Sequence, residues 1–175
     1  GFDAEALAKG VKPGEYGLTP GDLTELKRLF EHATTFGSLI QIPEGLAEKL
    51  PELKQLSEAT SHDLFVSEAL KRLGPLVCQV ELLAAHYDAV VANPPYMGSK
   101  YQTSLLKKFT GDNYSDAKSD LFASFIERSY TLAKRTGHGA MVTMQSWMFL
   151  SSFEKMRERL LRERTIASMA HLGPR

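Results

Sequence analysis

The sequence predicts an α/β fold in which a helical region precedes an open, parallel sheet. Over residues 1–86, leucines recur at intervals of three and four, which is the period of amphipathic helices. Over residues 87–175, short apolar runs alternate with amphipathic segments, as in consecutive βαβ units whose strands are parallel. We therefore expect two parts, a helical accessory region or insertion at 1–86 and an α/β part at 87–175.

Composition limits the class of protein. The 175 residues include 21 basic and 21 acidic side chains, and 43% of them are hydrophobic, which excludes a disordered, collagen-like or coiled-coil chain. A single cysteine excludes an intrachain disulfide and is typical of a cytoplasmic protein. No apolar run reaches the roughly 18 residues of a membrane span, and the histidines lack metal-ligand spacing. We expect no membrane association and no metal.

The zero net charge hides an asymmetry. Residues 1–87 hold 8 basic and 13 acidic side chains, a net charge of −5, whereas residues 88–175 hold 13 basic and 8 acidic, a net charge of +5. Such a division favours a nucleic-acid face on the second half, although two halves with different surfaces would show the same pattern.

Local signals set the helices of the first half. Glycines and Pro13 predict a loop over 1–18, and Thr19 is the expected N-cap of a helix that ends at Phe36. A second helix should open at Pro43. A third should begin near 61–63 and be broken or kinked at Gly74-Pro75. No chemical motif lies here, so an insertion, a lid and a docking element remain equally open.

Strand and helix signals alternate in the second half. Residues 87–92 predict a buried strand, and a polar loop should then lead to a helix capped by Ser119 or Asp120. We expect residues 137–139, Gly-His-Gly, to end that helix, and residues 140–144 to form the next strand. Residues 151–154 match an S-x-x-E capping box that opens a last helix, and 166–171 predict a third strand.

The motif with chemical content is Asn93-Pro94-Pro95-Tyr96, directly after the first predicted strand. Open α/β sheets bind ligands at the carboxyl ends of their strands. Asn93 offers a side-chain carbonyl and Pro94 a main-chain carbonyl, and the two prolines hold the turn rigid. Two fixed acceptors can bind both hydrogens of a planar amino group and direct its nitrogen at an electrophile. The alternative is a rigid turn that merely ends the strand.

This arrangement suits methylation of an exocyclic amine. Such an amine is a poor nucleophile because its lone pair is delocalised into the ring. Hydrogen bonds to both N–H groups favour pyramidalisation, so catalysis would consist of positioning and electrostatics. If the amine belongs to a base in a duplex, that base must be flipped out, and Tyr96 offers a flat face for stacking.

Three segments, VVANPPYMGSK, KSDLFASFIERS and GAMVTMQSWMFLSSFEKMR, resemble the gamma-type adenine-specific DNA methyltransferases, in particular those of the BREX and phage-growth-limitation defence systems. The resemblance implies a partial Rossmann-like class I methyltransferase sheet. It assigns the catalytic role to Asn93, Pro94, Pro95 and Tyr96. It implies S-adenosyl-L-methionine as cofactor, with Asp120 and Phe122 near its pocket; capping by Asp120 and a core position for Phe122 are equally open.

The sequence departs from this family at the cofactor site. It contains no strand followed by the glycine-rich turn that binds the methyl donor. Together with the missing initiator Met, this leads us to expect an internal fragment that is inactive alone and does not bind S-adenosylmethionine tightly.

Basic residues near the motif are candidates for contact with a DNA backbone. Lys100, Lys107 and Lys108 follow the motif closely, and Trp147 lies where relatives line the rim of the active site. An interior tryptophan is the plainer reading of Trp147. The arginines at 157, 159, 162 and 164 alternate with glutamates and favour a solvated helix face.

The sequence therefore predicts part of a DNA N6-adenine methyltransferase of phage defence, acting on double-stranded DNA with a flipped adenine and accompanied by other defence proteins. Two alternatives remain. The same motif serves methylation of RNA bases and of a protein glutamine amide, and a non-catalytic interaction module could retain the fold as a scaffold.

Overall fold

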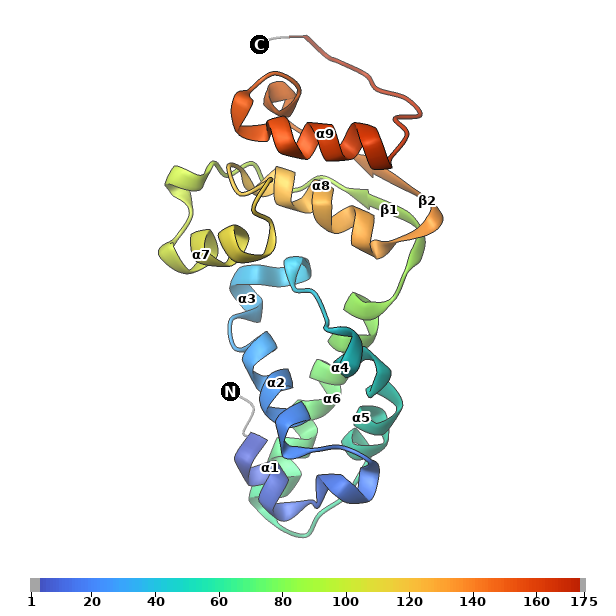
Figure 1. The fold of residues 1–175 in the computed structure, drawn as a ribbon. Coiled ribbons are helices and arrows are strands. Elements are labelled where there is room, and N and C mark those ends of the chain that lie inside the picture. The colour runs from blue at the N-terminus through green and yellow to red at the C-terminus, as the bar shows by residue number, and fades with distance from the viewer. Residues whose placement is uncertain (1–3, 174–175) are drawn as a thin grey trace. The chain divides into compact units, whose positions relative to one another are not determined.

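The structure, a computed structural model, describes residues 4–173 (Figure 1). The chain divides into two compact units between Ala85 and His86, next to the boundary expected from the sequence. Within the described part of the chain, no helix has the length and hydropathy needed to cross a bilayer.

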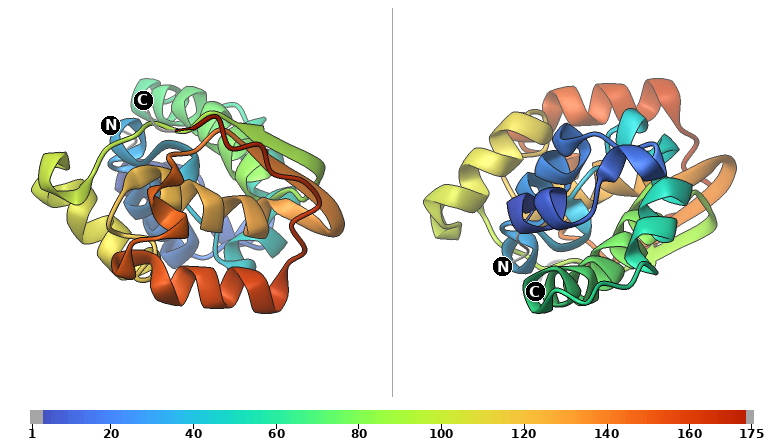
Figure 2. Two further views of the ribbon diagram at one scale, coloured as in Figure 1. Left: turned by 90° about the horizontal axis from the view of Figure 1, so that it is seen from above. Right: turned by 90° about the horizontal axis from the view of Figure 1, so that it is seen from below.

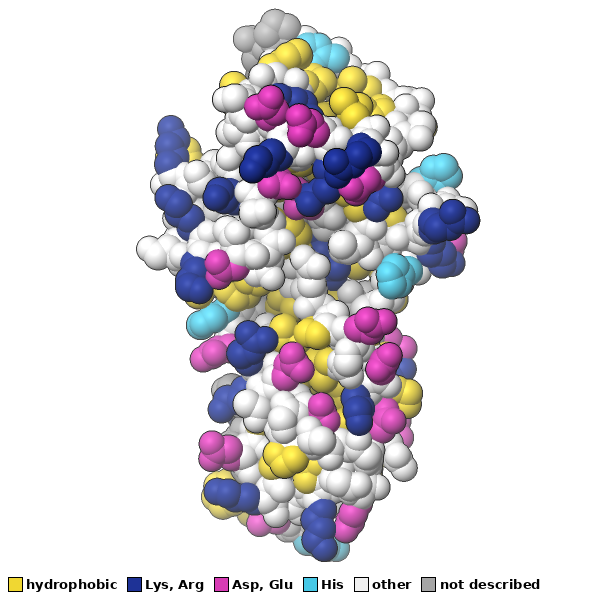
Figure 3. All heavy atoms as spheres, viewed as in Figure 1, with side chains coloured by type: hydrophobic (Ala, Val, Ile, Leu, Met, Phe, Trp, Pro, Cys, Tyr) yellow, Lys and Arg dark blue, Asp and Glu magenta, His cyan; other side chains and the backbone are white. Residues whose placement is uncertain are grey.

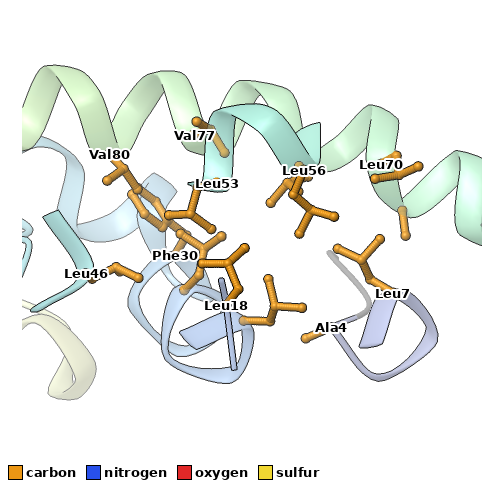
Figure 4. Close-up of a cluster of buried hydrophobic side chains, with 14 of the residues drawn as sticks. Ala4, Leu7, Leu18, Phe30, Leu46, Leu53, Leu56, Leu70, Val77 and Val80 are labelled. Carbon is orange, nitrogen blue, oxygen red and sulfur yellow. The ribbon is translucent and has the colours of Figure 1, made fainter. Parts of the chain in front are cut away.

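The first unit is helical. Its α-helices are α1 (Ala4–Gly10), α2 (Pro20–Phe30), α3 (Ala33–Phe36), α4 (Glu44–Glu48), α5 (Leu50–Ser57) and α6 (Leu64–Ala84). Short 3-10 turns occupy Pro13–Tyr16 and Gly37–Leu39. Side chains from α1, α2, α5 and α6 point toward one another in one apolar core, with Leu7, Phe30, Leu53 and Val77 among them (Figure 4).

The expected loop at 1–18 is wrong for residues 4–10, which form α1, whereas residues 11–18 contain only the 3-10 turn Pro13–Tyr16 and irregular chain. Helix α1 is short, but Leu7 on it is fully buried, and α1 packs against both α2 and α6. Its helical form thus depends on tertiary packing, which outweighs the weak local signal. Residues 1–3 of the expected loop lie outside the described residues.

Two of the predicted helix starts are confirmed by their hydrogen bonds. The Thr19 hydroxyl accepts from the Asp22 N–H at 3.2 Å, and the Asp22 carboxylate accepts from the Thr19 N–H at 2.7 Å, a reciprocal capping box. Asp63 caps α6 by accepting from the Phe65 N–H at 2.8 Å. Each cap satisfies amides that have no partner inside the helix.

Two of the predicted helices are interrupted, and one expected interruption is absent. The helix expected to reach Phe36 stops at Phe30 and resumes as α3, and the one opening at Pro43 divides at Lys49. Helix α6, in contrast, runs through Pro75 without a break. Proline removes one intrahelical hydrogen bond, but Leu73 and Val77 on either side are buried, and their packing offsets that loss.

The second unit contains a two-stranded parallel sheet. Strand β1 (Tyr87–Ala92) pairs with β2 (Ala133–Met141), and the two run side by side (Figure 2). The helices are α7 (Ser104–Asn113), α8 (Leu121–Leu132) and α9 (Glu154–Glu163), with 3-10 turns at Ser99–Tyr101, Gln145–Met148 and Ser151–Phe153. The crossover between the strands carries α7 and α8, and α8 packs on the sheet.

Strand β2 begins earlier than predicted. Helix α8 already ends at Leu132, so Gly-His-Gly does not end it and lies within the strand instead. The pairing is irregular between Tyr87 and Ala89. At that irregularity a Cβ on Gly137 would lie 2.8 Å from the carbonyl oxygen of Tyr87. The glycine is therefore required by close approach of the two strands.

Other expectations for the second unit are corrected. The polar loop contains helix α7, whose cap is the hydroxyl of Thr103. Residue Phe153, not Ser151, precedes the first residue of α9, and a 3-10 turn takes the place of the expected capping box. Residues 166–171 form no strand and are exposed, because no neighbouring strand among residues 4–173 extends the sheet beyond β1 and β2.

The prediction that β1 is buried is also wrong. The strand itself is confirmed, but Val91 is 78% exposed. Helix α8 covers one face of the sheet, and a two-stranded sheet has no further strands to shield its other residues. The buried apolar side chains of this unit instead gather along α8 and at the start of α9, including Phe122, Phe153 and Met156.

A charged contact joins α9 to α8. Arg159 forms an ion pair with Glu127 on α8 and lies 3.5 Å from the carboxylate of Asp116. Burial raises the pKa of Glu127 above its ordinary value, and the attraction of Arg159 only partly opposes this. The contact holds α9 in position against α8.

Candidate active site

The Asn-Pro-Pro-Tyr motif lies at the carboxyl end of β1. Strand pairing continues up to it, because the carbonyl of Ala92 accepts a hydrogen bond from the Val142 N–H at 3.1 Å. Pro94 is buried, whereas Asn93 and Tyr96 are exposed. The structure thus anchors the loop through one proline and leaves the two polar side chains open.

Asn93 and Tyr96 contact each other. The Tyr96 hydroxyl donates a hydrogen bond to the Asn93 side-chain oxygen at 3.3 Å. That oxygen is one of the two acceptors that the sequence predicted for a substrate amino group. The tyrosine hydroxyl therefore donates to the same oxygen that a substrate amino group would use.

The Tyr96 ring rests on an aromatic cluster. It meets the ring of Phe122 edge to face, with 6.1 Å between centroids and an interplanar angle of 86°. Phe122 is fully buried and packs in turn against Phe153, at 5.8 Å. Phe122 thereby supports the Tyr96 ring on one side, and Tyr96 is still 48% exposed.

Asp120 connects this loop to helix α8. One oxygen of its carboxylate accepts from the Met97 N–H at 2.9 Å and from the Phe122 N–H at 3.4 Å. Asp120 is thus the N-cap of α8, which decides between the two candidates, Ser119 and Asp120, that the sequence offered. It also contacts the residue directly after Tyr96, which the sequence did not predict.

Gln102 is a site residue that the sequence analysis missed. It is 8% exposed and donates to the carbonyl of Met97 at 3.2 Å, while its own carbonyl accepts from the Thr110 hydroxyl at 3.3 Å. The stretch around it was interpreted as a polar loop. Its only sequence signal is a glutamine ahead of the Thr103 cap, which is too common to identify a buried network.

The predicted DNA contacts lie on three separate elements, the 3-10 turn Ser99–Tyr101, helix α7 and the 3-10 turn Gln145–Met148. The Lys100 ammonium sits 4.8 Å from the centre of the Tyr101 ring, and Lys108 pairs with Asp112 along α7 at 3.0 Å. Lys107, also on α7, is exposed. Trp147 is half-buried in the turn after β2 and donates to the Thr143 hydroxyl at 3.2 Å.

The arginines of α9 and its end contact other parts of the protein. Arg157 donates to the carbonyls of Trp147 and Leu150 at 2.7 and 2.6 Å, and Arg164 lies 5.1 Å from the centre of the Tyr130 ring. On the face in Figure 3, blue and magenta side chains alternate over this helix. Arg157 and Arg164 therefore contact other parts of the second unit, and the solvated face remains a prediction.

Among residues 4–173, no three His, Cys, Asp or Glu side chains come together as a metal site would require.

Comparison with known proteins adds independent information. The family described as Eco57I restriction-modification methylase matches residues 24–175. The chain is 48% identical over 151 residues to adenine-specific methyltransferase BrxX of Escherichia coli O9:H4 (strain HS), which covers 84% of this chain. It is 37% identical over 171 residues to adenine-specific methyltransferase PglX of Lacticaseibacillus casei (strain Zhang), which covers 95%.

A more distant relative is the type II restriction enzyme and methyltransferase RM.Eco57I of Escherichia coli, 23% identical over 155 residues and covering 81% of this chain. The matched regions make up only 12%, 14% and 16% of the three relatives, so the chain spans a small part of their length. The family match nevertheless includes the whole second unit with its Asn-Pro-Pro-Tyr loop, and the chain belongs to the Eco57I restriction-modification methylase family.

Proposed function

We propose that the protein carrying this chain is an adenine-specific DNA methyltransferase that transfers a methyl group to the N6 amino group of a flipped adenine. One observation carries the proposal. The Asn-Pro-Pro-Tyr loop stands at the carboxyl end of a parallel strand, and it exposes an amide oxygen and an aromatic ring that lie in contact. The descriptions of BrxX and PglX as adenine-specific methyltransferases support the choice of adenine.

The chemistry follows from the two acceptors of the loop. The side-chain oxygen of Asn93 and the main-chain oxygen of Pro94 would accept the two N–H groups of the adenine amine. This favours a pyramidal nitrogen whose lone pair is available for attack. After the transfer the extra proton stays on the positively charged N6, hydrogen-bonded to these acceptors, until it is lost to solvent. The prolines keep both oxygens in place, so little reorganisation accompanies the reaction.

Tyr96 would hold the base. Its exposed ring offers a face for stacking, while Phe122 supports the ring from its edge. The Asn93 oxygen has two lone pairs, so it can accept from the adenine amine as well as from the Tyr96 hydroxyl.

The described residues fit one side of an S-adenosylmethionine site. Asp120 presents a partly exposed carboxylate beside the loop, and Phe122, which is fully buried, would shape the site only by supporting the Tyr96 ring. When bound, S-adenosylmethionine supplies an electrophilic methyl group on a sulfonium. No glycine-rich turn after a strand occurs within residues 4–173, so the other side of the cofactor needs further residues.

We further propose that β1, β2 and α8 belong to a Rossmann-like class I methyltransferase sheet, and that the protein acts in phage defence beside other defence proteins. Lys100, Lys107, Lys108 and Trp147 remain candidates for the DNA-facing rim. The first three could neutralise phosphates, which would make binding dependent on salt. The alternatives of an RNA base, a glutamine amide or a non-catalytic module are not favoured by the relatives, whose descriptions are of adenine-specific methyltransferases.

Methylome sequencing tests the proposal. Cells would carry the complete gene with its neighbouring genes, because such enzymes can need partners, and the wild type would be compared with Asn93→Ala. We expect N6-methyladenine at one defined motif in the wild type and none in the variant, because removal of the amide takes away one of the two acceptors.

Asn113→Ala is the matched control. Asn113 lies at the end of α7, where its amide donates to the Phe109 carbonyl at 2.9 Å, away from the loop. Methylation should persist in this variant. Equal methylation in the wild type and in Asn93→Ala would contradict the assignment of Asn93, and an absence of methyladenine from the wild type would contradict the proposed activity itself.

A further inference from the structure

We infer that Asp120 is a positioning residue for the Asn-Pro-Pro-Tyr loop: its carboxylate ties the exit of that loop to the cap of α8 and so fixes where Tyr96 and Asn93 stand. The inference rests on the proposed methyl transfer. It differs from a role in binding the cofactor, because the contacts that define it are made with the protein backbone.

The backbone of Met97, the residue after Tyr96, is held at both polar groups. Its N–H donates to the Asp120 carboxylate at 2.9 Å. Its carbonyl accepts from the Leu121 N–H at 3.0 Å and from the Gln102 amide at 3.2 Å. The exit of the loop and the start of α8, more than twenty positions apart in the sequence, are thereby joined at Met97. We call this set of backbone contacts the lock.

The lock continues on both sides of Asp120. The Ser99 N–H donates to the carbonyl of Ser119 at 2.9 Å, and Gly98 forms an antiparallel bridge with Asp120. On the other side, the same carboxylate oxygen accepts from the Phe122 N–H, which begins the helix that carries the ring supporting Tyr96. Asp120 therefore fixes both the backbone after Tyr96 and the surface on which its ring rests.

A small displacement of the Asn-Pro-Pro-Tyr loop is enough to slow the proposed reaction. Catalysis by positioning requires the two acceptors to stay within about half an ångström of their productive places. Without the carboxylate, the Met97 N–H loses its acceptor and the loop exit is held by carbonyl contacts alone. The loop would remain attached to the protein but would be less well defined at Tyr96.

The test compares three variants of the complete protein. Asp120→Ala removes the carboxylate. Asp120→Asn retains an oxygen at the same place and an equally good helix cap. Asp63→Ala, the matched control, removes the corresponding cap of α6, where Asp63 accepts from Phe65 and Val66 at 2.8 and 3.2 Å, without touching the loop.

Steady-state methylation would be measured with DNA and S-adenosylmethionine, together with the melting temperature. We expect Asp120→Ala to lower kcat by roughly 10- to 100-fold, since a displacement near 1 Å can cost about 100-fold. The KM for S-adenosylmethionine should stay within about 2-fold of the wild-type value, because the contacts by which Asp120 positions the loop are not made to the methyl donor. Asp120→Asn should restore kcat to within about 5-fold of the wild type, the loss of charge assistance being small.

Two outcomes would overturn the inference. A KM for S-adenosylmethionine that rises in both Asp120→Ala and Asp120→Asn while kcat is kept would assign the carboxylate to the cofactor. A drop in kcat in Asp63→Ala equal to that in Asp120→Ala, at a similar melting temperature, would show that loss of a cap alone explains the effect.

Hydrogen exchange separates this inference from the proposed function. Amide exchange over residues 93–99 should be faster in Asp120→Ala than in the wild type and unchanged in Asp63→Ala, whether or not the protein methylates DNA. If the wild type is inactive but shows this exchange pattern, the proposed activity is contradicted and the positioning role of Asp120 is supported. If exchange is unchanged in Asp120→Ala, the positioning role is contradicted even when the enzyme is active.

Discussion

Tyr96 makes two separate contacts, one through its hydroxyl and one through its ring, and substitution can separate them. Tyr96→Phe keeps the ring on Phe122 and removes only the bond to Asn93. Tyr96→Ala removes both. Since stacking of a base on an aromatic side chain contributes about 1–3 kcal/mol, we expect Tyr96→Ala to lower kcat/KM by roughly 10- to 100-fold and Tyr96→Phe by only a few-fold. Single-turnover methylation of a duplex oligonucleotide measures both.

Tyr16→Phe, in the first unit, controls for removal of a tyrosine hydroxyl outside the Asn-Pro-Pro-Tyr motif. Equal losses in Tyr96→Phe and Tyr96→Ala would mean that the hydroxyl, and not the aromatic face, carries the function of this residue.

At the residue scale, sequence reasoning succeeded where chemistry is local. Placement of Asn93 and Tyr96 after a strand followed from an apolar run ended by two prolines. Capping by Asp120 followed from a carboxylate ahead of an amphipathic segment. Gln102 could not be found in this way, because its importance comes from partners on other elements, the Met97 carbonyl and the Thr110 hydroxyl.

At the scale of elements, Gly137 is required where β1 and β2 approach most closely. In Gly137→Ala the new Cβ would stand 2.8 Å from the Tyr87 carbonyl oxygen and 3.1 Å from that of Asp88. Both are backbone atoms and cannot turn aside. We expect a destabilisation of roughly 1–3 kcal/mol, which would lower the melting temperature of this unit by about 5 °C or more. Thermal unfolding of the 175-residue chain, followed by circular dichroism, measures it.

Gly139→Ala is the matched substitution in the same strand. Its Cβ would meet only the Ser129 hydroxyl oxygen, at an ordinary 3.7 Å. A melting temperature lowered equally in both variants would show that loss of glycine itself, and not the close approach at Gly137, is responsible.

This glycine also explains an error of prediction. Gly-His-Gly after a helical pattern is typical of a helix end, yet α8 stops at Leu132 and the glycines serve the irregular pairing of β2. Elements with their own caps, such as α2 and α6, were predictable at their starts. Helix α1 and the end of α8 depend on contacts with residues far away in the sequence, and the local sequence pattern does not indicate such contacts.

At the scale of the whole molecule, we propose that the described residues supply only one side of a cofactor site. We therefore expect the isolated 175-residue chain to bind S-adenosylmethionine weakly, with a dissociation constant above about 1 mM, or not at all. The reason is the absence, among residues 4–173, of a strand followed by a glycine-rich turn. Isothermal titration calorimetry measures it, with the complete protein as the positive control.

Tight and saturable heat from the isolated chain would contradict this expectation. It would also show that Asp120, Phe122 and their neighbours hold more of the donor than a single wall.

The general organisation was predictable from the sequence because helical period, apolar runs and charge change together near residue 86. The helical, net-acidic first half and the net-basic half with the parallel strands are separate compact units. The third strand at 166–171 and the burial of β1 were not predictable in this way. Both depend on whether further strands lie beside these residues. The apolar pattern of a segment does not show which strands are next to it in the sheet.

The way Met97 is held also bears on how the sequence of this loop can diverge. Asp120, Leu121 and Gln102 all contact backbone atoms of Met97, and none of these contacts involves its thioether. The lock therefore places no demand on the side chain at position 97, whereas it depends on a short acceptor at 120. Among related sequences we therefore expect position 97 to vary more than position 120, where only residues with a short acceptor keep this contact.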